Sequence, residues 1–389
     1  MENHSIEPVP SRRKKLGWFG RTVLFFNWFF AIALLAGNLA PLVSPARVWS
    51  LAFLGLIQPV LFVICIIFLI YWGIRRKRHV LISAVIVLLS LVHFGKQCQV
   101  RLGQPDQAPT NSFRMLSWNV KLFDLYNWSG NTTTRSKMLD LLKNQNADLL
   151  CLQEFYTEDT GARRNMDTIK ALLKYPYSTA AYTITLRQKD HWGVATFSRF
   201  PIVNSGKIVF NNRSNNICLY TDLVIDGDTV RVYNMHLQSI NFGYSDLHFV
   251  ETVLNEEQAE DEIANSKSIL RRMKRAYTRR AEQSNAIAAH MASCPYPRIV
   301  CGDFNDTPVS YTYRTISEGL RDAFRESGSG FGKTLNIDGG GEKDWASRLP
   351  FPRIDYIFTS VEYSSWEFET IHADSMSDHY PITCKIGKE

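Results

Sequence analysis

Residues 299–308 read IVCGDFNDTP, an apolar run that stops at polar side chains. The run predicts a buried strand with Asp303 and Asn305 at its end, two residues apart. Side chains two apart along a strand point to the same face, so the carboxylate and the amide are expected to face the same way. GDFND alone would more often be a turn, because Gly, Asn and Asp favour turns. The prediction of a site therefore depends on the rest of the chain.

Two later stretches also combine acidic residues and a histidine with apolar runs. Residues 353–358 read RIDYIF with Asp355, and residues 377–382 read SDHYPI with Asp378 and His379. Metal-assisted attack of water on phosphorus needs such groups, because the metal takes hard oxygen ligands and the nucleophile needs an orienting acceptor. The combination favours a phosphoester hydrolase.

Three upstream segments repeat the pattern of a polar side chain where an apolar strand stops. They are MLSWNV (115–120) with Asn119, DLLCLQEF (148–155) with Glu154, and VRVYNMHLQS (230–239) with Asn234 and His236. Each residue alone has a plainer explanation, as a turn, a solvated strand end or a satisfied core histidine. All of them together, in one order, indicate a shared site.

The order of these motifs resembles the endonuclease/exonuclease/phosphatase superfamily, the deoxyribonuclease-I-like hydrolases. In chain order the motifs are SWNV, LQEF, HWGVATFSRFPI, NMHLQS, GDFNDTP, RIDYIF and SDHYPI. The resemblance covers residues 112 to 387, and its specificity comes from the order of the motifs rather than from any one of them. It implies a two-sheet α/β sandwich with the site at one edge.

The resemblance also implies which residues bind metal and water. Glu154, with Asn119 close by, would hold Mg²⁺ or Mn²⁺, the hard cation that neutralises phosphate oxygens. Asp378 would be a further carboxylate near the metal. Asp303 would orient or deprotonate the attacking water, and Asn305 beside it would fix the phosphoryl group.

The histidines receive roles on the phosphoryl group. His379 would hydrogen-bond a phosphoryl oxygen or help the leaving group, and Asp355 would hold its imidazole in the useful tautomer. His236 would contact the phosphate from the other side, with Asn234 supporting it. In-line displacement without a covalent enzyme intermediate is expected. Arg199 and Lys207 are further candidate phosphate contacts.

The first hundred residues are far more apolar than the rest and predict membrane spans. Residues 22–43 and 49–73 each approach or exceed the about 20 apolar residues that cross a hydrocarbon core, and residues 80–95 are shorter but carry no charge. A signal peptide is an alternative for the first run, but two more runs would still hold the product in the membrane. The predicted organisation is a cytoplasmic basic tail (1–21), three transmembrane helices (22–96), a linker (97–111) and a catalytic domain (112–389).

Flanking charge predicts the orientation in the cell's inner or plasma membrane. Basic residues fill positions 12–15 and 75–78, whereas the first loop offers only Arg47. Basic clusters stay on the cytoplasmic side, which puts the catalytic domain on the non-cytoplasmic side. If residues 80–95 do not cross, the catalytic domain is instead cytoplasmic.

The remaining features are less informative. Much of the net charge of +7 sits in the basic clusters, and the seven cysteines show no spacing typical of zinc. Cys294 and Cys301 could pair in an oxidising compartment. Residues 245–292 predict a long helix, first acidic and then basic, which is either solvated or holds a basic face near lipid headgroups or an anionic substrate.

Between the motifs, helical and strand-like runs alternate, as in a layered α/β fold. Helices are predicted at 136–146 and 166–176, and strands at 147–154, 194–202, 206–210, 217–225 and 229–237.

The substrate is left open, since the superfamily cleaves DNA, RNA ends, inositol phosphates and sphingomyelin with one shared site. The membrane anchor favours a lipid headgroup or a small phosphodiester, and the expected partners are the bilayer and this substrate, with no protein partner inferred. A tethered nuclease is the alternative, suggested by Arg187, Lys189, His191 and Trp192. A silent binding module is a third, against which the complete set of polar residues argues.

Overall fold

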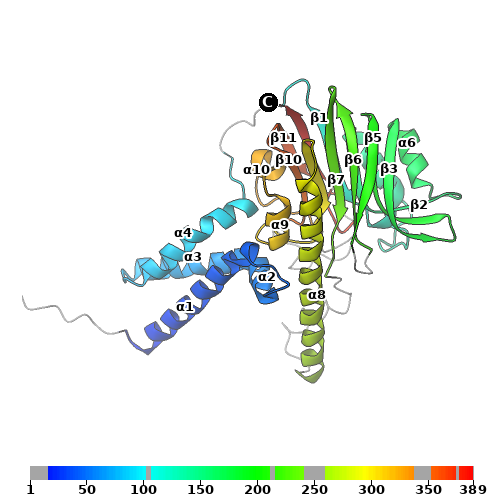
Figure 1. Cartoon of the computed structure of the whole chain (residues 1–389). Coiled ribbons are helices and arrows are strands. Elements are labelled where there is room, and N and C mark those ends of the chain that lie inside the picture. The colour runs from blue at the N-terminus through cyan, green and yellow to red at the C-terminus, as the bar shows by residue number, and fades with distance from the viewer. Residues whose placement is uncertain are drawn as a thin grey trace, which may run out of the picture.

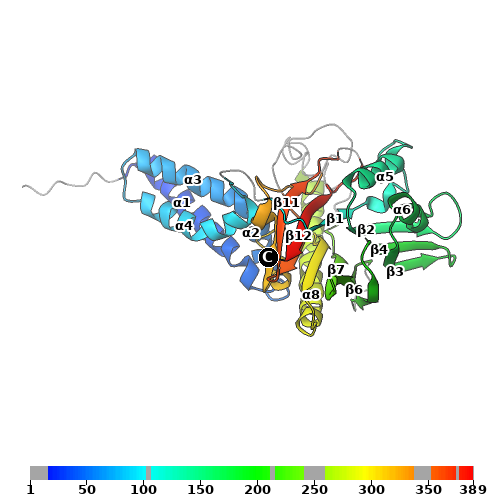
Figure 2. The ribbon, with the colours of Figure 1, turned by 90° about the horizontal axis from the view of Figure 1, so that it is seen from above.

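The computed structural model describes residues 16–101, 107–210, 215–240, 259–336, 352–373 and 376–388. An N-terminal helical bundle stands beside a larger α/β sandwich (Figures 1 and 2). The predicted basic cluster at 12–15 and the first part of the predicted charged helix, residues 245–258, lie outside the described residues.

The sandwich consists of two six-stranded sheets. The first has the order β11-β12-β1-β2-β4-β3 and the second the order β5-β6-β7-β8-β10-β9. The strands of the first sheet are β1 Phe113–Asn119, β2 Leu149–Glu158, β3 Tyr177–Leu186, β4 Asp190–Ser198, β11 Tyr363–Thr370 and β12 Ile382–Lys388. Those of the second are β5 Ile202–Val209, β6 Ile217–Ile225, β7 Asp228–His236, β8 Arg298–Asp303, β9 Leu320–Asp322 and β10 Asp355–Ser360.

Each sheet contains one central parallel pair, and these pairs gather the predicted motifs. β1 runs parallel to β2, and β7 runs parallel to β8 with His236 opposite Asp303. β10 runs antiparallel to β8, so its first residue, Asp355, is also opposite Asp303. Strand ends that are far apart in the sequence therefore meet at one edge of the sandwich.

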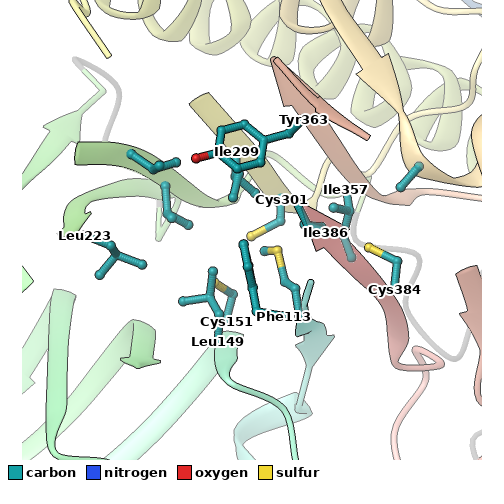
Figure 3. Packing of buried hydrophobic residues seen from close by; sticks show 14 of the residues in the cluster. Phe113, Leu149, Cys151, Leu223, Ile299, Cys301, Ile357, Tyr363, Cys384 and Ile386 are labelled. Carbon is teal, nitrogen blue, oxygen red and sulfur yellow. The ribbon is translucent and has the colours of Figure 1, made fainter. Parts of the chain in front are cut away.

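The core between the sheets is apolar and closes around side chains from both layers (Figure 3). Cys151 of β2 and Cys301 of β8 are both fully buried there, together with Ile299 and Ile357. Cys294 and Cys301 are free thiols, so the disulfide considered from the sequence does not form in this structure. Cys301 points into the core, whereas Cys294 lies half-exposed beyond the end of α8.

The inward-facing rows of side chains change from apolar to polar toward one end of the sandwich. On β8 the row is Ile299, Cys301 and Asp303, and on β10 it runs from Ile357 to Asp355. The corresponding row of β1 ends in Ser117 and Asn119, whereas that of β7 ends in Asn234 and His236. The alternation of strand side chains thus carries buried core positions directly into the polar end.

Helices cover the outer faces of both sheets. On the first lie α5 Thr134–Gln145 and α6 Asn165–Leu173, and on the second lie α8 Ala259–Ala292 and α9 Tyr311–Ile316, with η2 Lys121–Phe123 and α10 Ala323–Ser327 in connections. These bounds confirm the helices predicted near 136–146 and 166–176 and most of the predicted strands. The strand predicted at 194–202 ends at Ser198, and Ile202 begins β5 beyond Pro201, which cannot donate to a strand ladder.

The N-terminal bundle contains α1 Trp18–Asn38, η1 Ala40–Leu42, α2 Trp49–Leu56, α3 Gln58–Ile74 and α4 Val80–Gln97. Two helical segments among the described residues, Trp18–Leu42 and Val80–Gln97, are long and apolar enough to cross a membrane. The run predicted as one span at 49–73 forms two helices, α2 and α3, bent by 63°, which together are also apolar and long enough to count as one broken span or as a re-entrant loop. Pro59 lies in the first turn of α3, where its missing N–H and its ring interrupt a continuous helix.

Candidate active site

Asp303 lies at the centre of the polar end, and two amides fix its carboxylate. Its Oδ2 accepts hydrogen bonds from Asn119 Nδ2 and Asn305 Nδ2, both at 3.0 Å. Its Oδ1 accepts the backbone N–H of Asn305 at 2.8 Å. Asn305 has a positive φ of 52°, a conformation in which its amide folds back onto the carboxylate. The carboxylate is therefore held in one orientation.

His379 and Asp355 form a buried pair beside this carboxylate. His379 Nδ1 lies 2.9 Å from Asp355 Oδ2 and 3.2 Å from Oδ1, and its Nε2 lies 3.6 Å from Asp303 Oδ2. Burial alone would lower the pKa of His379, but the charges of Asp355 and Asp303 raise it well above the ordinary value. Asp355 accepts the proton on Nδ1, and the raised pKa favours the imidazolium, which also carries a proton at Nε2.

His236 approaches Asp303 from β7. Its Nε2 lies 3.6 Å from Asp303 Oδ2 and 3.5 Å from Glu154 Oε1, and it is buried without a hydrogen-bond partner among the described residues. Burial lowers the pKa of His236 below its ordinary value. A buried polar nitrogen without a protein partner indicates that a bound ligand supplies its hydrogen bond.

The buried position of Asp303 changes its acidity. Burial raises the pKa of its carboxyl group to about 6, with Asp355 adding to the shift and the two histidines opposing it. A carboxylate with such a pKa can accept a proton near neutral pH.

Glu154 and Asp378 are the carboxylates on the open side of the site. Glu154 has a φ of 45° and lies at a bulge in the pairing of β2 with β4, which turns its side chain toward the cleft. Burial and the negative charge of Asp378 raise the pKa of Glu154. Asp378 pairs with Lys121 Nζ at 3.1 Å, and despite burial the charges of His379 and Lys121 lower its pKa.

The donor set fits a hard divalent cation. Glu154, Asn119 and Asp378 offer only oxygen ligands, and repulsion between the two carboxylates would be relieved by a positive charge. A second group, Asp303, Asp355 and His379, also has donor atoms within 4.8 Å of one another and could hold a metal ion. There, however, Nδ1 of His379 is already engaged with Asp355.

Comparison with known families agrees with this geometry. Residues 116–379 match the model described as the endonuclease/exonuclease/phosphatase family. The chain belongs to this family. A second model, a domain of unknown function (DUF8431), matches residues 20–97, and no curated protein sequence matches.

The chain is similar to several solved structures at low sequence identity. A family protein from Bacteroides thetaiotaomicron is 17% identical, covering 74% of this chain and 100% of its own, with a TM-score of 0.50. A mannosyl-6-phosphatase from Bacteroides thetaiotaomicron VPI-5482 is 16% identical, covering 71% and 100%, with a TM-score of 0.49. The catalytic domain of human Nocturnin with a bound sulfate is 18% identical, covering 74% and 98%, with a TM-score of 0.47.

A cleft of about 570 Å³ opens from the site of this family member. Glu154, His236 and Asp378 line one part of it, and Trp192, Gln238 and Arg279 are among the residues that line the rest. Of the residues considered for nucleic-acid binding, Trp192 lines the cleft, while His191 contacts Asp159 and stacks on Tyr182. Its volume lies within the range of about 300–1,000 Å³ that is typical of small-molecule pockets.

Nine residues were predicted to act in catalysis or metal binding, and eight of them lie at the polar end. Glu154, His236 and Asp378 line the cleft, and the others surround Asp303: Asn119, Asn305, His379 and Asp355. Asn234 lies deeper, since its Oδ1 accepts Gln153 Nε2 at 2.7 Å and its Nδ2 donates to Ala195 O at 2.9 Å. It joins the two sheets beneath His236 rather than facing the cleft. Arg199 pairs with Asp148 at the opposite end of the first sheet, and Lys207 is exposed on the edge strand β5.

Lys121 is the site residue that the sequence reasoning missed. Its ammonium group holds Asp378, and it begins a run of four residues with positive φ, 121–124. The available signal was a lysine two residues after Asn119, just beyond a strand end. A left-handed run without glycine could not be read from residue types.

Proposed function

We propose that the chain is a divalent-metal-dependent phosphodiesterase anchored in a membrane by its N-terminal helices. The observation that carries the proposal is the arrangement around Asp303, whose carboxylate is fixed by Asn119 and Asn305 and flanked by His236 and His379. A fixed proton acceptor between two phosphate-binding imidazoles is suited to in-line attack of water on phosphorus.

Asp303 orients the attacking water and takes its proton. The bonds from the two amides leave the carboxylate little freedom to rotate, so the water it holds has a defined direction of attack. Its pKa of about 6 keeps it ionised at neutral pH but basic enough to assist the attack. Asn305 acts by positioning Asp303, since its Nδ2 donates to Asp303 Oδ2 and to Leu237 O, both at 3.0 Å.

The two histidines contact the phosphoryl oxygens. His379, with Nδ1 bound to Asp355, directs Nε2 to the reacting group and either hydrogen-bonds a phosphoryl oxygen or protonates the leaving group. His236 Nε2 takes a phosphoryl oxygen as its hydrogen-bond partner from the opposite side. The negative charge that develops on the phosphoryl oxygens is thus stabilised by two preorganised donors, His379 Nε2 and His236 Nε2, on opposite sides.

Glu154, with Asn119 and Asp378, would hold the metal, with Mg²⁺ or Mn²⁺ suited to the oxygen donors. When bound, the cation supplies Lewis-acid neutralisation of the phosphate oxygens. Lys121 keeps Asp378 in position on that side of the cleft.

The favoured substrate is a lipid headgroup or a small phosphodiester. The cleft, about 570 Å³, has the volume of a small-molecule site. Two of the N-terminal helical segments are long and apolar enough to cross a bilayer, which would keep the site near lipid. The tethered nuclease is a second candidate, favoured only by Trp192 in the cleft wall, where a base could stack.

A hydrolysis screen of the full chain in lipid nanodiscs tests the proposal. Phospholipids, sphingolipids, small phosphodiesters, plasmid DNA and RNA are each supplied with Mg²⁺, with EDTA and Asp303→Asn as controls. Release of a lipid headgroup or small alcohol that both controls abolish is the expected result. Cleavage of DNA or RNA alone would favour the nuclease, and no turnover of any phosphoester would contradict the proposal.

A further inference from the structure

The helical bundle and the sandwich are joined directly where the chain leaves α4 (Figure 1). Gln99 and Gly330 exchange two backbone hydrogen bonds, at 2.8 and 2.9 Å. Arg101 donates from Nε to Gly328 O and from Nη2 to Arg325 O, both at 2.9 Å. The start of the predicted linker at 97–111 is therefore docked on the sandwich beside α10.

Arg353 reaches the end of α4 from inside the sandwich. Its Nη2 donates to the backbone oxygen of Lys96, in the last turn of α4, at 3.0 Å. Both terminal nitrogens also bind Asp322, at 3.1 and 2.8 Å, and the side chain is only 1% exposed. The guanidinium group packs 4.4 Å from the ring centre of Phe324 and 4.6 Å from that of Tyr356. A buried cation with so few partners depends on each of them.

Arg353 lies two residues before Asp355, which forms the buried pair with His379. Ile354 O accepts the N–H of Phe304 at 2.9 Å, which ties this segment to the residue after Asp303. Asp355 N donates to Thr334 Oγ1 at 3.1 Å, and its carboxylate holds His379. Only Ile354 separates Arg353 from Asp355, and the N–H groups of Ile354 and Asp355 both donate to Thr334 Oγ1.

The end of α4 is itself held by polar side chains buried between the helices. Gln97 Nε2 donates to Gln58 Oε1 at 2.7 Å, and Asn38 Nδ2 donates to Ser90 Oγ at 2.7 Å. Gln58 Nε2 approaches Asn38 Oδ1 at 3.5 Å. Polar bonds between otherwise apolar helices fix how the helices sit against one another. The position of Lys96 O is therefore set by the packing of α1, α3 and α4.

We propose that Arg353 is a positioning residue for the Asp355–His379 pair, and that the helical bundle regulates the site by holding Arg353 through the end of α4. The catalytic consequence rests on the proposed function, while the structural link stands without it. Rearrangement of the helices, by lipid or by a bound partner, alters how Asp355 orients His379.

The test compares variants on both sides of the contact, in the full chain in nanodiscs. Arg353→Gln removes the charge, Arg353→Lys retains it without the planar fork, and Gln97→Leu removes the bond to Gln58 at similar volume. Arg298→Gln is the matched control in the sandwich, since Arg298 also donates to a helix-end carbonyl, Met291 O at 3.0 Å, but away from α4. Ser83→Ala is the control in the bundle, because it breaks the buried bond to Asn27 at the other end of α4.

Two measurements are made on each variant. Arg353→Gln is expected to lower kcat by roughly ten- to a hundredfold with KM little changed, as misplacement of a catalytic group does. Gln97→Leu is expected to lower kcat by roughly three- to tenfold, the size of couplings through packed networks, and Arg353→Lys should recover part of the loss. By hydrogen exchange, residues 352–359 should exchange faster in Arg353→Gln and in Gln97→Leu, but at the wild-type rate in both controls.

Unchanged exchange of residues 352–359 in Gln97→Leu would overturn the inference, as would an equal loss of kcat in Arg298→Gln. If the wild type hydrolyses no phosphoester, the proposed function fails, and the exchange measurement still decides whether the bundle holds this segment.

Discussion

Removing Asp355 should disable His379 without removing it. In the structure Asp355 lies 2.9 Å from Nδ1 of the imidazole, and both side chains are buried. A buried hydrogen bond to a charged group contributes about 1.5–3 kcal/mol. Since 1.4 kcal/mol is about a factor of ten in rate, Asp355→Asn should lower kcat by roughly ten- to a hundredfold. His379→Ala, which removes the group itself, should lower it by about a hundredfold or more.

The double variant distinguishes a cooperating pair from two independent contributions. If Asp355 acts only through His379, Asp355→Asn combined with His379→Ala should be no slower than His379→Ala alone. Independent action would instead multiply the losses to roughly a thousandfold or more. The assay is steady-state kcat at saturating Mg²⁺ for the wild type, both single variants and the double variant. Asp222→Asn is the control, because Asp222 forms a buried pair with Arg231 away from the cleft.

Multiplicative losses in the double variant would refute the idea that the two residues act as a unit. Near-wild-type turnover in Asp355→Asn would refute the role of the carboxylate. A comparable loss in Asp222→Asn would show that the assay reports folding rather than chemistry.

Three further predictions concern the base, the metal and the topology. Because Asp303 must be ionised and its pKa is about 6, kcat should fall as the pH drops through this value, and Asp303→Asn should show low turnover without this acidic limb. Glu154→Gln should raise the Mg²⁺ concentration needed for half-maximal activity while leaving the melting temperature nearly unchanged, and EDTA should abolish turnover by the wild type. A reporter active only after export should be active when fused after residue 389 and silent near Arg78, whereas the reverse pattern would place the catalytic domain in the cytoplasm.

The parts of the site predicted from the sequence are those that strand ends reveal. Asp303, Asn305 and His236 each stand where an apolar alternation breaks, and a polar residue at such a position is visible in residue types alone. The order of the motifs then carried the family resemblance, which implied one shared site at an edge of the sandwich and which no local pattern contains. The structure places His236 and Asp355 opposite Asp303, where that order had implied a common site.

The features that were missed depend on backbone conformation or on contacts between distant segments. The bulge at Glu154 and the left-handed run beginning at Lys121 occur at residues without the usual preference for positive φ. The bond from Arg353 to Lys96 joins positions 257 residues apart, and RIDYIF gives no sign of it. Pro59 could have predicted the bend between α2 and α3, since proline interrupts helices, but the continuous apolar run of residues 49–73 favoured a single span.

Asp303 lies where the inward-facing side chains of β8 change from apolar to polar. Gln153 Nε2 bonds Ser117 Oγ at 3.1 Å and Asn234 Oδ1 at 2.7 Å, forming a polar layer between the apolar core and Asp303. Burial against this layer gives Asp303 its raised pKa of about 6. One pKa unit corresponds to about 1.4 kcal/mol, so above pH 6 the ionised Asp303 carboxylate lowers the free energy of unfolding by about 3 kcal/mol. This destabilisation is lost as the pH falls below the pKa that Asp303 has in the unfolded chain. The basicity of Asp303 and its cost in stability thus have the same cause, which is the burial of its carboxylate at the polar end of the sandwich core.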